Sequence, residues 1–190
     1  MLRRLDPEIQ AFNTSVNQSF DYNGIIVPMS DIPQGTGPNQ RDGNVIHAVS
    51  LDYNLRLVVA ATSPVTCRFL ICRLLQPESG LTVSEVIDNV GSGLAPNAQY
   101  NMETHGQSSE DRRIEILYDR TVSVSTSYKP VAQIKGSLSL GGDSHSLVRY
   151  SGSSLPPVTG AYVGIVICSL AGPAGLPAAV GTFRLHFLDA

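Results

Sequence analysis

Residues 30–44, SDIPQGTGPNQRDGN, combine three glycines with a cation in one short stretch. The Gly-Thr-Gly run at residues 35–37 has the residue types that let backbone amides surround a phosphate, and Arg41 could add a positive charge. Phosphate loops of this kind lie between a strand and a helix, and a P-loop ends in Gly-Lys followed by Ser or Thr. Here the chain after Gly43 alternates as a strand does, and that ending is missing. We therefore interpret the segment as a turn that its prolines stiffen, and not as a nucleotide site.

Other residue types that could carry catalysis or bind a metal are dispersed. No His-x-His pair with a following glutamate occurs; we expect two histidines on strand faces, His47 and His186, and two in loops, His105 and His145. Asp143 and Ser144 stand beside His145, but the members of a catalytic triad converge from distant positions, so this run indicates a polar hairpin turn. Cys67, Cys72 and Cys168 lie in apolar runs without metal-ligand spacing and are predicted to be buried, reduced thiols. We predict no catalytic residue, no cofactor and no metal, and hence no enzyme.

The composition describes one folded domain of modest charge. The chain has 190 residues, 42% of them hydrophobic, and a net charge of −3, so it has no overall basic field to attract nucleic acid or a membrane. The basic candidates for nucleic-acid contact are scattered, which argues against base reading but leaves non-specific backbone contact open. These candidates are Arg3, Arg4, Arg68, Arg73, Lys129, Lys135 and Arg149.

Neither end of the chain predicts a membrane partner. No apolar segment follows Arg3 and Arg4, so we expect no signal peptide. Residues 151–183 contain no charged side chain, but the apolar run at 161–171 is too short for a membrane helix and is followed by glycines and prolines.

Strands must position these residues, since apolar and polar residues alternate with a period of two along much of the chain. The strongest case is residues 49–59; shorter ones are 20–23, 112–118, 121–125, 134–140 and 183–187. Residues 65–75 and 162–170 are more continuously apolar, as is typical of strands covered on both faces. Residues 82–91 instead predict a helix of about two turns, with a Thr82–Glu85 capping box and Gly91 as its stop. Many antiparallel strands with one small helix predict a two-sheet sandwich or a barrel.

Two motifs in this order resemble those of a known family. The segment IPQGTGPNQRDGNVI is similar to the Q-G-T-G-x-x-x-R-x-G segment of single-jelly-roll capsid proteins, from small circular single-stranded DNA viruses and the satellite tobacco necrosis virus-like group. Residues 113–125, RIEILYDRTVSVS, resemble a strand of the same proteins, and AYVGIVICSL and TFRLHFLDA resemble their last two strands. The resemblance spans residues 20–189.

The resemblance implies an all-β, eight-stranded antiparallel jelly-roll sandwich whose copies, typically sixty (T=1), close into an icosahedral shell around a genome. The matched positions are interpreted as structural and subunit-packing elements: Gln34, Gly35, Gly37, Arg41 and Gly43 in the loop, and Leu117, Tyr118, Asp119 and Arg120 in the strand. For Arg41 we expect a salt bridge or backbone bond across a subunit boundary, and an anion contact only secondarily.

The division that follows is an N-terminal arm at residues 1–17 and a jelly-roll shell domain at residues 18–190. Capsid proteins of this family usually carry a long basic arm, whereas here only Arg3 and Arg4 stand in its place. The implied partners are copies of the chain itself and, if a basic arm is present, packaged nucleic acid bound non-specifically. Weak nucleic-acid contacts are expected at Arg3, Arg4, Lys129 and Lys135. The host receptor is unknown, and no membrane partner is expected. The expected location is the virion, and the host cell interior during assembly.

One alternative of a different class stays open. A jelly roll can also serve as a soluble binding module for a carbohydrate or a receptor, and such a module can be trimeric. Exposed aromatic side chains clustered on one face would favour it.

Overall fold

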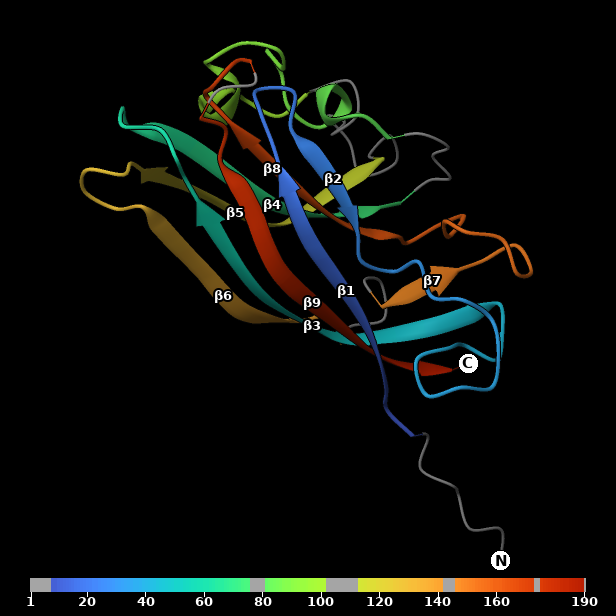
Figure 1. Ribbon diagram of the computed structural model, residues 1–190. Helices are drawn as coiled ribbons and strands as arrows, with labels where there is room; N and C mark the ends of the chain where they lie inside the picture. Colours follow the sequence, from blue (N-terminus) through green and yellow to red (C-terminus); the bar gives the residue numbers. More distant parts are fainter. Residues whose placement is uncertain (1–7, 76–80, 102–112, 142–145, 173–174, 190) are drawn as a thin grey trace, which may run out of the picture.

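The computed structural model describes residues 8–75, 81–101, 113–141, 146–172 and 175–189, which form two antiparallel sheets (Figure 1). The strands are β1 Gln10–Ser19, β2 Ile25–Pro28, β3 Val45–Val58, β4 Val65–Leu74, β5 Ile114–Val124, β6 Val131–Ser139, β7 Leu147–Arg149, β8 Tyr162–Cys168 and β9 Ala178–Asp189. Two 3-10 turns, η1 Val83–Glu85 and η2 Ala95–Asn97, lie in the connection between β4 and β5.

The strand order defines the fold. The first sheet has the order β1-β9-β3-β6, with β7 also pairing with β3, and the second has the order β2-β8-β4-β5. Eight strands in two four-stranded layers, connected from one layer to the other in this order, are a jelly roll. The predicted all-β, eight-stranded antiparallel jelly-roll sandwich is confirmed, and the three-residue β7 is a ninth strand at its margin.

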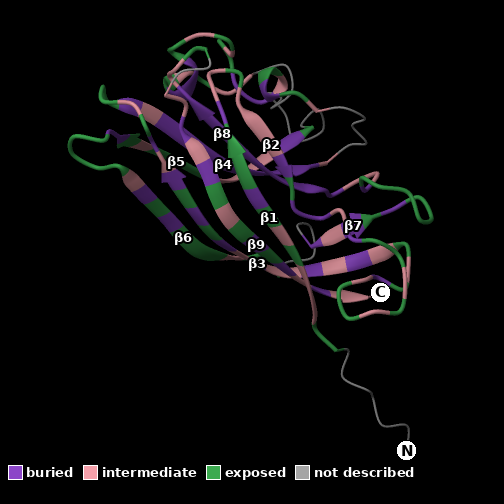
Figure 2. Ribbon diagram, in the orientation of Figure 1, coloured by how far each residue is buried: buried purple, intermediate pink, exposed green. Residues whose placement is uncertain are grey.

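The core between the sheets follows from the alternation predicted for the third strand. Leu51, Tyr53, Leu55 and Leu57 are buried and face the second sheet, while the polar residues between them face outward. Figure 2 shows the same alternation of buried and exposed residues along β6 and β9. The outer face of the first sheet is therefore exposed and polar.

The second sheet is covered on both faces. The described part of the β4–β5 connection packs on its outer side, where Leu70 and Cys72 of β4 meet Val83, Val86 and Ile87 in a second hydrophobic core. Every residue of β8 is buried, and so is almost all of β4. Coverage on both faces explains why these two strands are more continuously apolar than the others.

The two-turn helix predicted at residues 82–91 is wrong. The capping box between Thr82 and Glu85 is present, but only a 3-10 turn follows it. After that turn the backbone pairs with the returning chain, because Ile87 forms a bridge with Tyr100 and the Asn101 amide donates to the Val86 carbonyl. These bonds replace those a longer helix would need.

The first strand lies earlier than the alternation at residues 20–23 predicted. Gln10–Ser19 pairs along its whole length with β9, whereas Asp21 and Tyr22 belong to the turn before β2. The boundary proposed at residue 17 between arm and shell domain thus falls inside β1. Phe20 is buried in the core directly after the strand.

Candidate functional site

Arg41 holds the β2–β3 connection, and its side chain is completely buried. All three guanidinium nitrogens donate to backbone carbonyls of the same chain. Nε donates to Ile32 at 3.1 Å, Nη2 to Gly152 at 2.6 Å, and Nη1 to Gly43. Because Gly152 belongs to the β7–β8 connection, Arg41 ties together two loops that lie about 110 residues apart in the sequence.

Tyr150 covers the open face of this guanidinium. The guanidinium carbon lies 3.8 Å from the ring centre, and the Tyr150 hydroxyl donates to the Ser30 carbonyl at 2.7 Å. Burial raises the pKa of Tyr150, and the charge of Arg41 offsets only part of this rise. No carboxylate among the described residues forms an ion pair with Arg41. Its charge is therefore dispersed over carbonyls and a ring face, and it is not free to hold an anion from solvent.

The remaining matched residues of this loop lie around Arg41. The Gln34 side chain donates to the Asp42 carbonyl at 3.1 Å, and the Gly35 amide donates to the Arg41 carbonyl at 3.0 Å. The Gly37 amide donates to the side chain of Gln40 at 2.8 Å, and a Cβ on Gly35 would overlap that side chain. The structure thus brings the five loop positions together as one folded turn, in which the glycines leave room for Gln40. Whether this turn also packs against another subunit stays a prediction.

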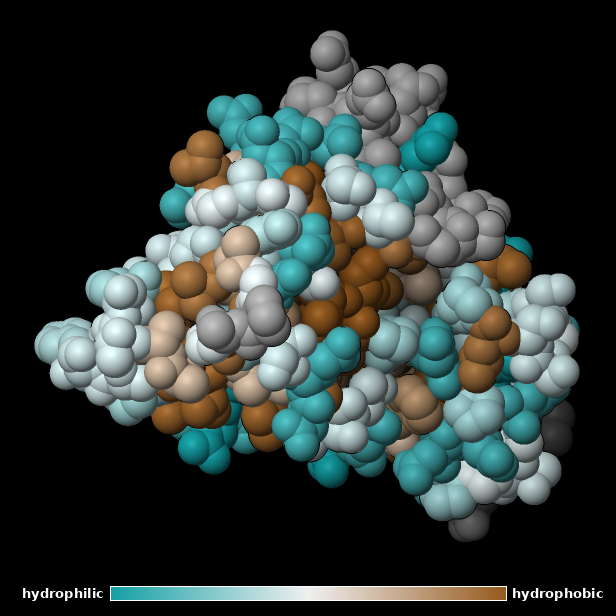
Figure 3. Space-filling view, turned by 45° about the horizontal axis from the view of Figure 1, so that its top comes forward, coloured by the Kyte–Doolittle hydropathy of each residue, from teal (hydrophilic) through white to brown (hydrophobic). Residues whose placement is uncertain are grey.

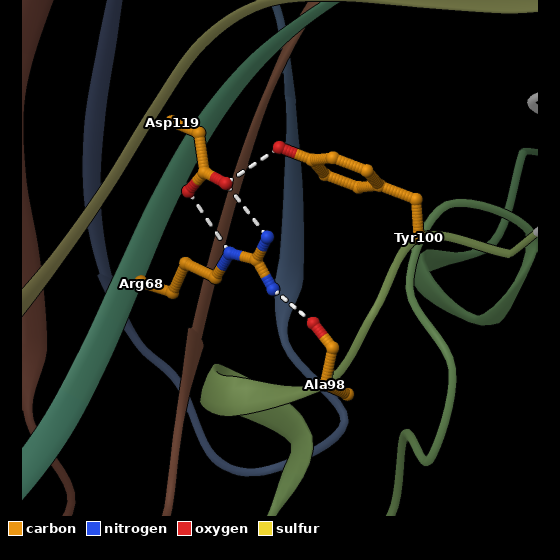
Figure 4. Close-up of polar contacts among 4 residues, drawn as sticks. All are labelled: Arg68, Ala98, Tyr100 and Asp119. Atoms are coloured by element: carbon orange, nitrogen blue, oxygen red, sulfur yellow. Dashed lines mark hydrogen bonds and ion pairs between the residues drawn. The ribbon is translucent and has the colours of Figure 1, made fainter.

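The matched strand motif also anchors a loop, through Asp119 (Figure 4). Arg68 of β4 binds the Asp119 carboxylate with two nitrogens, Nε at 2.9 Å and Nη2 at 2.6 Å, while Nη1 donates to the Ala98 carbonyl at 2.6 Å. The Tyr100 hydroxyl donates to the same carboxylate at 2.6 Å. Since Ala98 and Tyr100 belong to the β4–β5 connection, the cluster fastens that connection to the outer face of the second sheet.

The electrostatics of Asp119 match this role. Burial opposes ionisation of its carboxyl group, but the hydrogen bonds from Arg68 and Tyr100 and the charge of Arg68 outweigh burial and lower its pKa. Arg68 itself is only 7% exposed, and its donors bind groups of the same chain, so this candidate for nucleic-acid contact has a structural role instead.

The exposed face of the first sheet carries the other polar groups. A shallow groove of about 360 Å³ on it is lined by Asn13, Asp52, Tyr53, Asn54, Thr182 and Arg184. His186 lies 3.1 Å from Asp52, as expected for a histidine on a strand face. The pKa of Asp52 is lowered, mainly by a hydrogen bond from Ser137 and further by the hydrogen bond and charge of His186; burial opposes this shift. Ser137 bonds to the carboxylate and not to the imidazole, so these three groups do not have the order of a catalytic triad.

Of the four residues predicted to contact nucleic acid weakly, two lie in described parts of the chain. Lys135 is exposed on β6 and shares the outer face of the first sheet with Arg56 and Arg184. Lys129 lies apart from them, in the hairpin between β5 and β6. Arg3 and Arg4 lie outside the described residues, as do His105, Asp143, Ser144 and His145.

Sequence reasoning missed Arg56 and Arg184, although both occupy outward positions in alternating strands and could have been found by that signal. It also missed Tyr150, whose role depends on a loop distant in sequence.

The described ranges contain neither a candidate metal cluster nor a membrane-spanning helix. No group of three or more His, Cys, Asp or Glu residues there could hold a metal ion. Within the same ranges, no helix has the length and apolar character needed to cross a bilayer. The three cysteines are buried and free.

The chain is thus an all-β protein of jelly-roll topology. No family model and no curated protein sequence matches it. Among solved structures it is similar to a chain of Desmodium yellow mottle tymovirus, at 8% identity and a TM-score of 0.40, covering 98% of this chain and 91% of that chain. It is also similar to a chain of broad bean stain virus, at 10% identity and a TM-score of 0.39, covering 97% of this chain and 89% of that chain. A third similar chain comes from naturally occurring empty particles of cowpea mosaic virus, at 12% identity and a TM-score of 0.35, covering 97% of this chain and 92% of that chain. Similarity this distant carries no inference about what the chain does.

Proposed function

We propose that the chain is a viral capsid protein that binds copies of itself to form a small icosahedral shell. The observation that carries the proposal is the complete jelly-roll strand order, combined with a β2–β3 loop that contains the capsid-like motif from Gln34 to Gly43 and is fixed by the buried Arg41. A shell subunit has to present the same surface to every neighbour. Loops fastened by buried hydrogen bonds meet that requirement, because they are ordered before a neighbour arrives.

The size proposed for the shell follows from the resemblance. Sixty chains of 20.3 kDa would form a T=1 particle of about 1.2 MDa. The proposed location of the protein is the virion, and the host cell interior during assembly. The protein acts as a structural subunit and not as an enzyme.

Packaged nucleic acid would be held without sequence preference. Lys135, Arg56 and Arg184 outnumber Asp52 among the charged side chains on the open face of the first sheet, in a chain whose net charge is −3. This local excess of positive charge supports backbone contact on that face. Lys129 in the β5–β6 hairpin, and Arg3 and Arg4, are proposed as further weak contacts.

A second candidate function is a soluble jelly-roll module that binds a carbohydrate. The polar groove beside Asn13, Asp52 and Arg184 favours it, since its volume of about 360 Å³ is within the range of small-molecule sites. Tyr53, the aromatic residue in its lining, is only 7% exposed and offers little surface on which a sugar ring could stack.

Size-exclusion chromatography with light scattering and negative-stain microscopy tests the proposal. We expect uniform particles of megadalton mass, and the ratio of absorbance at 260 and 280 nm then reports whether nucleic acid is inside. A monomer or trimer over a range of protein concentration, salt and pH would contradict the capsid function. Binding of that monomer or trimer to a glycan array would support the second candidate.

A further inference from the structure

The hairpin between β5 and β6 carries the most exposed aromatic side chain in the described parts of the chain. Ser125 and Lys129 close this hairpin as a bridge, and Tyr128 beside them is 91% exposed. Apolar side chains exposed singly are common, but a tyrosine at a hairpin tip offers a large, stiff surface with a hydrogen-bonding end. That combination is enriched where proteins bind one another.

An apolar pocket of about 190 Å³ lies elsewhere on the molecule, beside β2 and β8. Its walls include Ile26, Leu74, Leu81, Pro156 and Val163. The volume is below the range of about 300–1,000 Å³ that is typical of small-molecule sites, so it suits a single side chain better than a free ligand. Figure 3 shows that apolar side chains do reach the surface on one face, where they gather in a hollow bordered by hydrophilic ones.

One charged group, Asp31, lines this pocket. Its carboxyl group is half-buried, and no hydrogen-bond donor among the described residues reaches it. Burial raises the pKa of Asp31. A carboxylate in an apolar wall is stabilised by a donor or a cation that enters the pocket with it.

We propose that Tyr128 of one copy inserts into this pocket of a second copy, with its hydroxyl donating to Asp31 and the ammonium group of Lys129 supplying the opposite charge at the rim. The inference rests on the proposed function, since it names a contact by which copies would associate. The pocket's size and charge match this hairpin tip: an apolar ring, a terminal donor and an adjacent cation.

The positions of the two features allow the contact to repeat. The β5–β6 hairpin lies at one end of the sandwich, and the β7–β8 connection that contributes Pro156 lies at the other (Figure 1). Each copy therefore offers the inserting tyrosine at one end and the receiving pocket at the opposite end. Contacts of this type can continue from copy to copy and close into a ring.

A tryptophan introduced at the hairpin tip tests the insertion directly, because the chain contains no tryptophan. In Tyr128→Trp, fluorescence emission should shift to shorter wavelength as protein concentration rises and copies associate. Ser127→Trp, at an exposed neighbouring position, is the control and should keep its water-exposed emission. Adding Asp31→Lys to Tyr128→Trp should abolish the shift at the same concentration.

A charge exchange then tests the pairing of Lys129 with Asp31. Asp31→Lys and Lys129→Asp should each raise the concentration needed for association about tenfold or more, and the double variant should recover most of the loss. Circular dichroism checks that each variant is folded.

Two results would overturn the contact but leave the capsid function standing. One is that Tyr128→Trp assembles into particles while its tryptophan emission stays unchanged. The other is that the single charge variants associate as the wild type does. A wild-type chain that never associates would overturn both the contact and the capsid function.

Discussion

The guanidinium carbon of Arg41 lies over the Tyr150 ring, 3.8 Å from its centre, in the interior of the molecule. A buried cation is costly unless its donors are satisfied, and here backbone carbonyls from two loops satisfy them. The pair therefore determines the conformation of both loops.

Replacing this arginine should destabilise the whole chain. In Arg41→Ala the carbonyls of Ile32, Gly43 and Gly152 lose their donor inside the protein, and we expect the free energy of unfolding to fall by more than about 3 kcal/mol. Urea denaturation measures it. Arg56→Ala, on the exposed face of β3, is the matched control and should change it by less than about 0.5 kcal/mol. Equal stability of the two variants would show that other contacts hold the loop.

The Asp119 cluster should make stability depend on acid pH. In the folded chain the pKa of Asp119 is lowered from its usual 3.8. The ionised carboxylate therefore contributes its full stabilisation to the free energy of unfolding above pH 3.8. This stabilisation is lost as the pH falls through the lower pKa of the folded state. Asp119→Asn should lower the free energy of unfolding by about 2 kcal/mol at pH 7, a figure reduced because the carboxylate is partly exposed. It should also flatten the fall in stability below pH 4. Urea titrations at several pH values measure both effects, and an unchanged acid slope would rule out Asp119 as its source.

Gly181 on β9 should not tolerate a side chain. A Cβ at this position would overlap the Asn54 carbonyl oxygen on β3 and come within 2.8 Å of the Leu55 Cα. We expect Gly181→Ala to cost about 1–3 kcal/mol, as overpacking typically does. Gly141→Ala, with no atom within 4 Å of the added Cβ, is the control. Thermal unfolding followed by circular dichroism compares them, and matching midpoints would refute the expected close approach of β9 and β3.

The three thiols should be inert while the chain is folded. Burial raises the pKa of Cys67 and of Cys72 to about 12 and that of Cys168 to about 11, so very little thiolate exists at pH 8. A colourimetric thiol reagent should find almost no reactive group in the native protein and three after addition of denaturant. Rapid labelling of one thiol in the native state would indicate local opening of its strand.

The strands could be predicted where burial differs between their two faces. The alternation of Leu51, Leu55 and Leu57 with polar residues that face solvent predicts β3. β1 gave no such signal, since small polar residues occupy most of its length and only Phe12 and Val16 are inward-facing apolar residues. The helical spacing of Val83, Val86 and Ile87 was misleading, because backbone pairing with Tyr100 decided the local conformation.

The loop motif could be located from sequence, but not its internal chemistry. Glycines and prolines indicated a turn at residues 30–44, and nothing in that segment points to Gly152 or Tyr150. Loop partners distant in sequence follow from the way both sheets stack. For the same reason no local sequence pattern points to the pocket lined by Asp31, which is assembled from β2, β4, β8 and three connections.

The order of the first sheet also constrains how the chain folds during synthesis. Among the described strands β1 pairs with β9 alone, where Gln10 lies opposite Phe187, and β9 is also the neighbour of β3. The chain must therefore be synthesised at least as far as β9 before the strand between β1 and β3 exists. Until then β1 and β3 have unpaired edges, which favour slow folding and misassociation between nascent chains. The mostly polar side chains of β1 keep this segment solvated until β9 has been synthesised.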